Sequence, residues 1–203
     1  MTSRSGLQLP GQASRYFDRH FQRQAWRLLP GEWQATGADE MIVTVLGSCV
    51  AVCLLDPEAA VGGMNHFMLP HLPAQAPEDP GLAGRYGFDA MNLLIEGTLQ
   101  LGAQRPRLVA KAFGGGRVVD GLGDVGGQNA AFIRGFLRAE GIPLLAEDLG
   151  GDRPRKVCLF PATGQVLVKR LAGRDHETLL LRERAWLDEL DPAPAASGAE
   201  PRR

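Results

Sequence analysis

The sequence has almost no net charge and no cluster of basic residues, and these shortages exclude a class of protein. Its 203 residues carry 22 Lys and Arg against 23 Asp and Glu, which gives a formal net charge of −1. Proteins that bind nucleic acid by neutralising phosphates need clustered Lys and Arg. We therefore expect no DNA or RNA partner.

Cysteine is scarce, and long apolar runs are absent. Three cysteines are too few, and odd in number, for the disulfide framework of a secreted domain. No run approaches the ~20 apolar residues that a membrane span requires. The first residues, MTSRSGLQLPGQ, also lack the apolar segment of a secretory signal. We expect a cytoplasmic protein without membrane insertion, whose cysteines remain thiols.

Apolar residues make up 44% of the chain, which is ample for a packed core, and the length suits one domain. Glycine and proline occur 26 and 14 times and divide the chain into many short elements. Residues 1 to about 14 are polar, and residues 191–203 contain no large apolar side chain. Since little there offsets the entropy of ordering, we expect both ends to be disordered.

Runs of β-branched and apolar residues predict strands at 41–47, 49–55, 61–69 and 108–113, with a bend between the first two at Gly47-Ser48. Two further runs within 156–171 predict a hairpin. Apolar residues at helical spacing, which include Phe88 and Met91 in the first case, predict helices at 85–101, 129–140 and 177–190. The expected fold class is α+β: a single domain with a mixed, sandwich-like β-sheet flanked by helices.

Cys49 is the residue best placed for chemistry, because it follows the expected bend at Gly47-Ser48. A sharp turn after a strand lifts a nucleophile out of the sheet and leaves backbone N–H groups free to stabilise an oxyanion. A thiol with an ordinary pKa of about 8.5 reacts as thiolate and needs an imidazole or another positive group nearby. His66 is the candidate partner, since a polar ring is otherwise hard to explain within its apolar run.

Packing is the competing interpretation for every thiol, because free cysteines are often buried. We interpret Cys53 and Cys158, which have apolar neighbours, as core residues. Zinc sites usually bring two close pairs of ligands, and Cys49, Cys53 and His66 lack the second pair, so no metal is predicted. Residues 121–126 fit G-x-G-x-x-G, but no strand directly precedes them. We interpret them as a loop and expect no cofactor.

The segments Leu46-Gly-Ser-Cys-Val50 and Gly62-Gly-Met-Asn-His-Phe-Met-Leu-Pro70 strongly resemble CheD, the chemoreceptor glutamine deamidase family of bacterial chemotaxis. Other segments look like family signatures in family order: Leu29-Pro-Gly-Glu32, Lys111-Ala-Phe-Gly-Gly115, Val125-Gly-Gly-Gln-Asn129, Asp148-Leu-Gly-Gly151, Arg155-Lys-Val157 and Thr163-Gly-Gln-Val-Leu-Val-Lys169. The resemblance implies a deamidase domain at 28–175. It leaves an N-terminal extension at 1–27, a helix at 176–190 and a disordered tail at 191–203.

The resemblance implies Cys49 as nucleophile, His66 as general base and acid, and Thr44 as the third catalytic member. For Thr44, a plain role as a β-branched strand residue competes with the catalytic one. The implied reaction converts receptor glutamines to glutamate through a thioester and releases ammonia, without a metal or organic cofactor. Backbone N–H groups near Ser48 to Val50 are expected to hold the oxyanion.

The implied substrate is the cytoplasmic domain of a chemoreceptor, and family members also bind a CheC-type phosphatase. Some relatives hydrolyse receptor glutamyl methyl esters, for which the same acyl-enzyme route serves. The alternative from another class is a non-catalytic adaptor that binds a phosphatase or a receptor. The resemblance makes residues 114–127 a candidate rim of the substrate groove. It makes Asn129 a candidate helix-start or loop-fixing residue.

Overall fold

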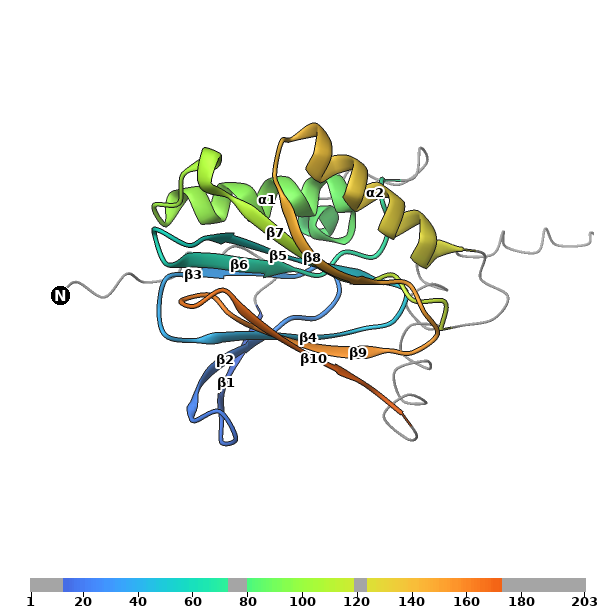
Figure 1. The fold of residues 1–203 in the computed structure, drawn as a ribbon. Helices are drawn as coiled ribbons and strands as arrows, with labels where there is room; N and C mark the ends of the chain where they lie inside the picture. Colours follow the sequence, from blue (N-terminus) through green and yellow to red (C-terminus); the bar gives the residue numbers. More distant parts are fainter. Residues whose placement is uncertain (1–12, 73–79, 119–123, 173–203) are drawn as a thin grey trace, which may run out of the picture.

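Two β-sheets lie face to face, and two helices pack on the outer side of one of them (Figure 1). The computed structural model describes residues 13–72, 80–118 and 124–172. Sheet A has the strand order β1 (Ser14–Asp18), β2 (Arg23–Arg27), β4 (Met41–Leu46), β9 (Arg155–Phe160) and β10 (Gln165–Arg170). Sheet B has the order β3 (Trp33–Thr36), β6 (Val61–Asn65), β5 (Val50–Asp56), β7 (Val109–Gly114) and β8 (Leu144–Leu149).

The helices are α1 (Gly87–Gln100) and α2 (Val125–Ala139), with short 3-10 helices η1 (Pro80–Arg85) and η2 (Arg105–Arg107). Both sheets are mixed, since β2 runs parallel to β4 and β7 runs parallel to β8, while the other pairs are antiparallel. The predicted α+β sandwich is therefore confirmed. Both α-helices cover sheet B, and no helix among the described residues covers the outer face of sheet A (Figure 1).

The central strand β5 is buried along its whole length, which explains why its sequence is a continuous apolar run. Alternate residues of a strand point to opposite faces. One set therefore packs toward the helices: Val50, Val52 and Leu54. The other set packs in the layer between the sheets: Ala51, Cys53 and Leu55. The strands predicted at 41–47, 49–55, 61–69 and 108–113 correspond to β4, β5, β6 and β7, and the predicted hairpin to β9 and β10.

Both described helices confirm a prediction but differ from it in detail. Phe88 lies in the first turn of α1 with 52% of its surface exposed, so it does not belong to the buried face of the helix. The second helix begins at Val125, four residues before the predicted start at 129. There the side chain of Asp124 accepts a hydrogen bond from the Gly127 N–H at 3.0 Å, which caps the helix. The helix predicted at 177–190 lies outside the described residues.

Residues 14–27 form the hairpin β1–β2, which extends sheet A at the edge of β4. Its inward-facing residue Trp26 is buried between the sheets, and its indole N–H donates to Glu40 at 2.7 Å. The strands β1, β2, β3 and β8 are absent from the sequence-based expectation. They are only four to six residues long, and polar residues interrupt each of them, so they lack the continuous apolar run that marks a buried strand.

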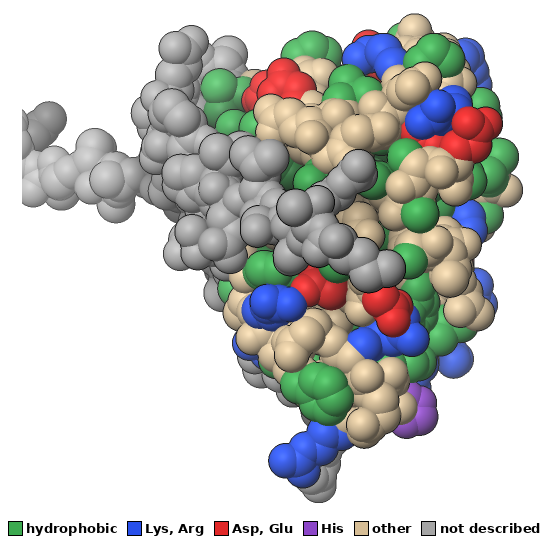
Figure 2. Space-filling view, turned by 90° about the vertical axis from the view of Figure 1, so that its left-hand side faces the viewer, with side chains coloured by type: hydrophobic (Ala, Val, Ile, Leu, Met, Phe, Trp, Pro, Cys, Tyr) green, Lys and Arg blue, Asp and Glu red, His purple; other side chains and the backbone are tan. Residues whose placement is uncertain are grey.

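Acidic and basic side chains are intermixed on the end of the molecule that carries the β5–β6 and β9–β10 turns (Figure 2). Among the described residues visible on this face, no basic patch gathers, in agreement with the near-neutral composition. Within the described ranges, no helix is long and apolar enough to cross a membrane.

Candidate active site

Cys49 and His66 lie at the same end of the sandwich, on neighbouring strands of sheet B. Cys49 directly precedes β5, and His66 directly follows β6. Beyond the regular ladder, Val50 and Phe67 form an antiparallel bridge, with N–O distances of 3.1 and 2.9 Å in the two directions. This bridge continues the β5–β6 register, in which Cys53 pairs with Met64.

The register places the two candidate residues on one face of sheet B. Continued by one residue, the Val50–Phe67 bridge sets Cys49 opposite Met68 and His66 opposite Ala51. Cys49, Ala51 and Met68 all belong to the core layer between the sheets, so His66 shares that face. Diagonal neighbours across an antiparallel pair have Cβ atoms about 7–8 Å apart or less, within reach of longer side chains. The backbone thus brings the predicted nucleophile and base together.

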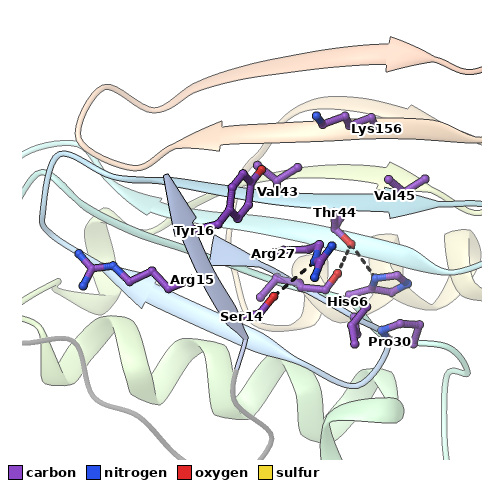
Figure 3. A pocket seen from close by; sticks show the side chains of 12 residues that line it. Ser14, Arg15, Tyr16, Arg27, Pro30, Val43, Thr44, Val45, His66 and Lys156 are labelled. Atoms are coloured by element: carbon purple, nitrogen blue, oxygen red, sulfur yellow. Dashed lines mark hydrogen bonds between the residues drawn. The ribbon is translucent and has the colours of Figure 1, made fainter. Parts of the chain in front are cut away.

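Thr44 completes the arrangement from the facing sheet. It is buried in the middle of β4, and its Oγ1 lies 2.8 Å from Nδ1 of His66 (Figure 3). The same hydroxyl donates its proton to the carbonyl oxygen of Leu28 at 3.0 Å. A hydroxyl has one proton to donate, so it must accept from His66, which places the ring proton on Nδ1. Nε2 of His66 is then the basic nitrogen.

The environment keeps His66 uncharged. The side chain has only 2% of its surface exposed, and burial lowers the pKa of its imidazole from 6.5 to about 3. Nε2 is buried and has no hydrogen-bond partner in the part of the chain that the structure describes. His66 is therefore a neutral base at physiological pH, with its acceptor nitrogen turned away from Thr44.

A glycine-rich segment after β7 fastens the loop that carries Cys49. The N–H groups of Gly115 and Gly116 donate to the carbonyl oxygens of Cys49 and Gly47, each at 2.8 Å. Gly114 has a φ of +106°, and a Cβ atom there would lie 2.2 Å from the Cys49 carbonyl oxygen. Only glycine fits this close approach.

Asn129 ties the Cys49 loop to the segment that carries His66. Its Nδ2 donates to the carbonyl oxygen of Ser48 at 3.1 Å and to that of Met68 at 2.8 Å. The side chain is completely buried in α2, four residues past the start of the helix. It is thus a loop-fixing residue rather than a helix-start residue, and one amide holds both candidate segments.

The expected oxyanion donors need one correction. The N–H of Val50 donates to the Phe67 carbonyl oxygen at 3.1 Å, since this bridge extends the sheet to the residue after Cys49. Val50 is therefore committed to the β-ladder and does not serve an oxyanion in this arrangement.

The other two thiols are core residues, as predicted. Cys53 is fully buried between the sheets, and burial raises the pKa of its thiol. Cys158 packs on the outer side of sheet A with Met41, Val43 and Phe160, and burial also raises its pKa. Neither thiol is suited to form a thiolate.

Alkylation of the folded protein is expected to modify Cys49 first. A thiol beside a neutral base reacts more readily than thiols whose pKa is raised by burial, and each unit of pKa changes the thiolate fraction about tenfold. Iodoacetamide at pH 7.5, followed by peptide mapping over time, measures the three rates. Faster labelling of Cys53 or Cys158 would contradict the assignment, and labelling in denaturant controls for intrinsic peptide differences.

A hollow of about 500 Å³ reaches Thr44 and His66 from the outer side of sheet A (Figure 3). It exists because β2 pairs with β4 only from Ala25 to Arg27, after which the Leu28 N–H still donates to Val43 and the chain then turns away. The edge of β4 is thus open beside Thr44. Cys49 is not among the residues that line this hollow.

A metal centre has no support in the described ranges. No group of three or more His, Cys, Asp or Glu side chains is placed there to hold an ion.

Comparisons with known proteins agree on one family. The family model described as "CheD chemotactic sensory transduction" matches residues 68–170. The "Probable chemoreceptor glutamine deamidase CheD" of Herminiimonas arsenicoxydans is 48% identical over 187 residues, which cover 91% of this chain and 92% of that protein. The "Probable chemoreceptor glutamine deamidase CheD 2" of Burkholderia thailandensis is 52% identical over 178 residues, with coverage of 86% and 91%. A similarly named protein of Shewanella oneidensis is 47% identical over 189 residues, with coverage of 92% of both chains.

Proposed function

Because this chain belongs to the CheD family, we propose that it is a chemoreceptor glutamine deamidase in which Cys49, His66 and Thr44 form the catalytic set. The observation that carries the residue assignment is the contact between Thr44 and His66. A threonine that accepts from Nδ1 leaves Nε2 as the base on the strand beside Cys49.

The reaction proceeds through an acyl-enzyme. Nε2 of His66 takes the Cys49 thiol proton as the sulfur bonds to the amide carbon of a receptor glutamine. The imidazolium then protonates the leaving nitrogen, the carbon–nitrogen bond breaks, and ammonia departs from the thioester. A water molecule, deprotonated by His66, attacks the thioester and yields glutamate, and the proton returns to the sulfur. Thr44 orients the imidazole throughout and stabilises its charged form by hydrogen bonding.

Deamidation is favoured over the adaptor alternative, because relatives that are similar over nearly the whole chain are named as the deamidase. The substrate is accordingly a chemoreceptor. Binding of a CheC-type phosphatase stays a prediction.

The proposed activity is tested by incubating the purified protein with the purified cytoplasmic fragment of a chemoreceptor from the same organism. We expect ammonia release, together with conversion of particular receptor glutamines to glutamate in peptide mass spectra. A fragment whose glutamines are replaced by alanine controls for ammonia from other sources. An unchanged receptor mass at high enzyme concentration would contradict the proposal.

Thr44→Val is expected to lower kcat about 10–100-fold, because valine has the same shape but accepts no hydrogen bond from Nδ1 of His66. Thr44→Ser keeps the hydroxyl and is expected to retain most of the activity. Steady-state ammonia assays separate kcat from KM, and a merely structural threonine would give equal rates in both variants. Thermal unfolding checks that both variants remain folded.

A further inference from the structure

The hollow beside Thr44 has a chemical character that the catalytic mechanism does not use. Arg15, Arg27 and Lys156 line it from three different strands of sheet A, and none of the described residues that line it is Asp or Glu. Figure 3 shows the hollow between the β1–β2 hairpin and the β4–β9 pair, with the two hydroxyl-bearing residues Ser14 and Tyr16 also on its wall. Cations without a carboxylate partner around a concave site create a positive potential that favours an anion.

Two of these cations form no ion pair with a carboxylate of the described residues. Arg15 pairs with Glu40 and lies over the Trp26 ring. Arg27 donates from Nε to the Ser14 hydroxyl at 3.3 Å. Neither Arg27 nor Lys156 forms an ion pair with any described residue. Both charges are thus available to a ligand.

Two acidic side chains lie within electrostatic range of these cations, and both already accept hydrogen bonds. The Asp18 carboxylate accepts hydrogen bonds from the N–H groups of His20 and Phe21 at 2.9 and 3.1 Å. The hydrogen bond from Phe21 and the charge of Lys156 both lower the pKa of Asp18. Glu32 feels the charge of Arg27, but its carboxylate accepts the Leu29 N–H at 2.7 Å. Neither carboxylate forms a salt bridge with Arg27 or Lys156.

Apart from Thr44 and His66, the other described residues of the wall are apolar. Leu28, Leu29 and Pro30 form the side at the end of β2, and Val43 and Val45 form the side on β4. Leu29 leaves 47% of its surface exposed at the rim. A hollow lined by apolar side chains and two cations without an ion pair suits a carboxylate on a short aliphatic stem, since the stem is desolvated while the head meets Arg27 and Lys156.

We propose that this hollow binds a glutamate side chain of an acidic peptide segment, with the carboxylate held by Arg27 and Lys156. The receptor is the occupant to which we commit, because each turnover leaves a glutamate on it; this part rests on the proposed function. Cys49 does not line the hollow, so a bound glutamate and a glutamine at the thiol occupy different places. The enzyme thereby holds a receptor segment by a glutamate while another side chain reacts.

The binding test uses a fluorescein-labelled receptor peptide in which every target glutamine is already glutamate, so that nothing is turned over. Fluorescence anisotropy at low salt is expected to give about tenfold weaker Kd for Arg27→Gln and for Lys156→Gln, with both effects reduced at high salt. Arg138→Gln, which removes an exposed charge from α2 on the opposite side of the molecule, is the matched control and should leave Kd unchanged.

Two further measurements decide the identity of the ligand. The same peptide with its glutamates replaced by alanine is expected to bind at least tenfold more weakly to the wild-type protein. Equal affinity for this glutamate-free peptide, or an unchanged Kd in Arg27→Gln and Lys156→Gln, would show that the proposed carboxylate site is wrong. Free glutamate that competes at the concentration of the peptide would overturn the assignment to a receptor segment.

Ammonia release by the same preparation separates this inference from the proposed function. If the wild type deamidates the receptor but Arg27→Gln and Lys156→Gln leave Kd unchanged, only the proposed carboxylate site is wrong. If the acidic peptide binds through these two cations but the receptor is not deamidated, only the proposed function is wrong.

Discussion

Cys49→Ala is expected to lower the rate of receptor deamidation by at least ~10⁴-fold, because the acyl-enzyme cannot form without the sulfur. The substitution removes one buried sulfur atom from the loop between β4 and β5. Fold and stability should change little, since the Gly115 N–H bonds to the backbone of residue 49 rather than to its side chain. Ammonia release and receptor mass spectra measure the activity, and circular dichroism with thermal unfolding verifies the fold.

Cys158→Ala is the matched control for the loss of a thiol. It removes a buried cysteine on the other side of sheet A, far from the Cys49 loop in the strand register, and should leave the deamidation rate within about twofold. Equal deamidation by the wild type and Cys49→Ala would eliminate Cys49 as the nucleophile. Loss of activity in Cys158→Ala, with the fold intact, would show that the thiol assignment is wrong.

His66→Gln is expected to lower kcat by about 10³-fold or more, because general acid–base catalysis of this kind contributes ~10²–10⁴-fold and here serves both half-reactions. Glutamine keeps a polar group near Thr44 but cannot take the thiol proton. The variant should also lose the preferential alkylation of Cys49. An unchanged kcat, measured by ammonia release at saturating receptor, would exclude His66 as the base.

The same variant has a second expected effect, on the pH dependence of stability. Burial lowers the pKa of His66 in the folded protein from 6.5 to about 3. Between these two values the unfolded chain binds a proton that the folded protein does not. The free energy of unfolding therefore falls as the pH falls from about 6.5 toward 3, by ~1.4 kcal/mol per unit.

Urea unfolding at pH 7 and pH 4.5 measures this contribution. The wild type should lose about 2.5 kcal/mol more than His66→Gln over this interval, because glutamine does not titrate. Identical losses in the two proteins would mean that His66 is protonated, or exposed, in the folded state. Well above pH 7 His66 adds no pH dependence, since it is then neutral in both the folded and the unfolded state.

Much of the sheet architecture could be predicted because its central strands are apolar on both faces. The runs that became β4, β5, β6 and β7 carry enough β-branched and apolar residues to identify them without neighbours. The hairpin β1–β2 could not be found in this way. Its residues become a strand pair only because β4 offers an open edge, and its burial against that edge depends on Trp26 and Ala25.

The candidate residues themselves were identifiable from their motifs, but their relation to one another was not. Asn129 was a candidate for either the start of a helix or the fixing of a loop, and only its contacts with Ser48 and Met68 decide between the two. Nothing in the sequence indicates that Arg27 and Lys156 lie near one hollow, because they are 129 positions apart in the chain. They share a hollow because β2 and β9 flank β4 on its two sides.

The sequence alone therefore determined the fold class, the family resemblance and the three residues expected to perform catalysis, since apolar runs and short motifs are local properties of a chain. The tertiary structure alone decided how those residues act. Thr44 and His66 are 22 positions apart and belong to different sheets, so only the packing of sheet A on sheet B sets their 2.8 Å contact. That contact, with the Leu28 carbonyl as the acceptor of the hydroxyl proton, assigns the tautomer of His66 and makes Nε2 the base.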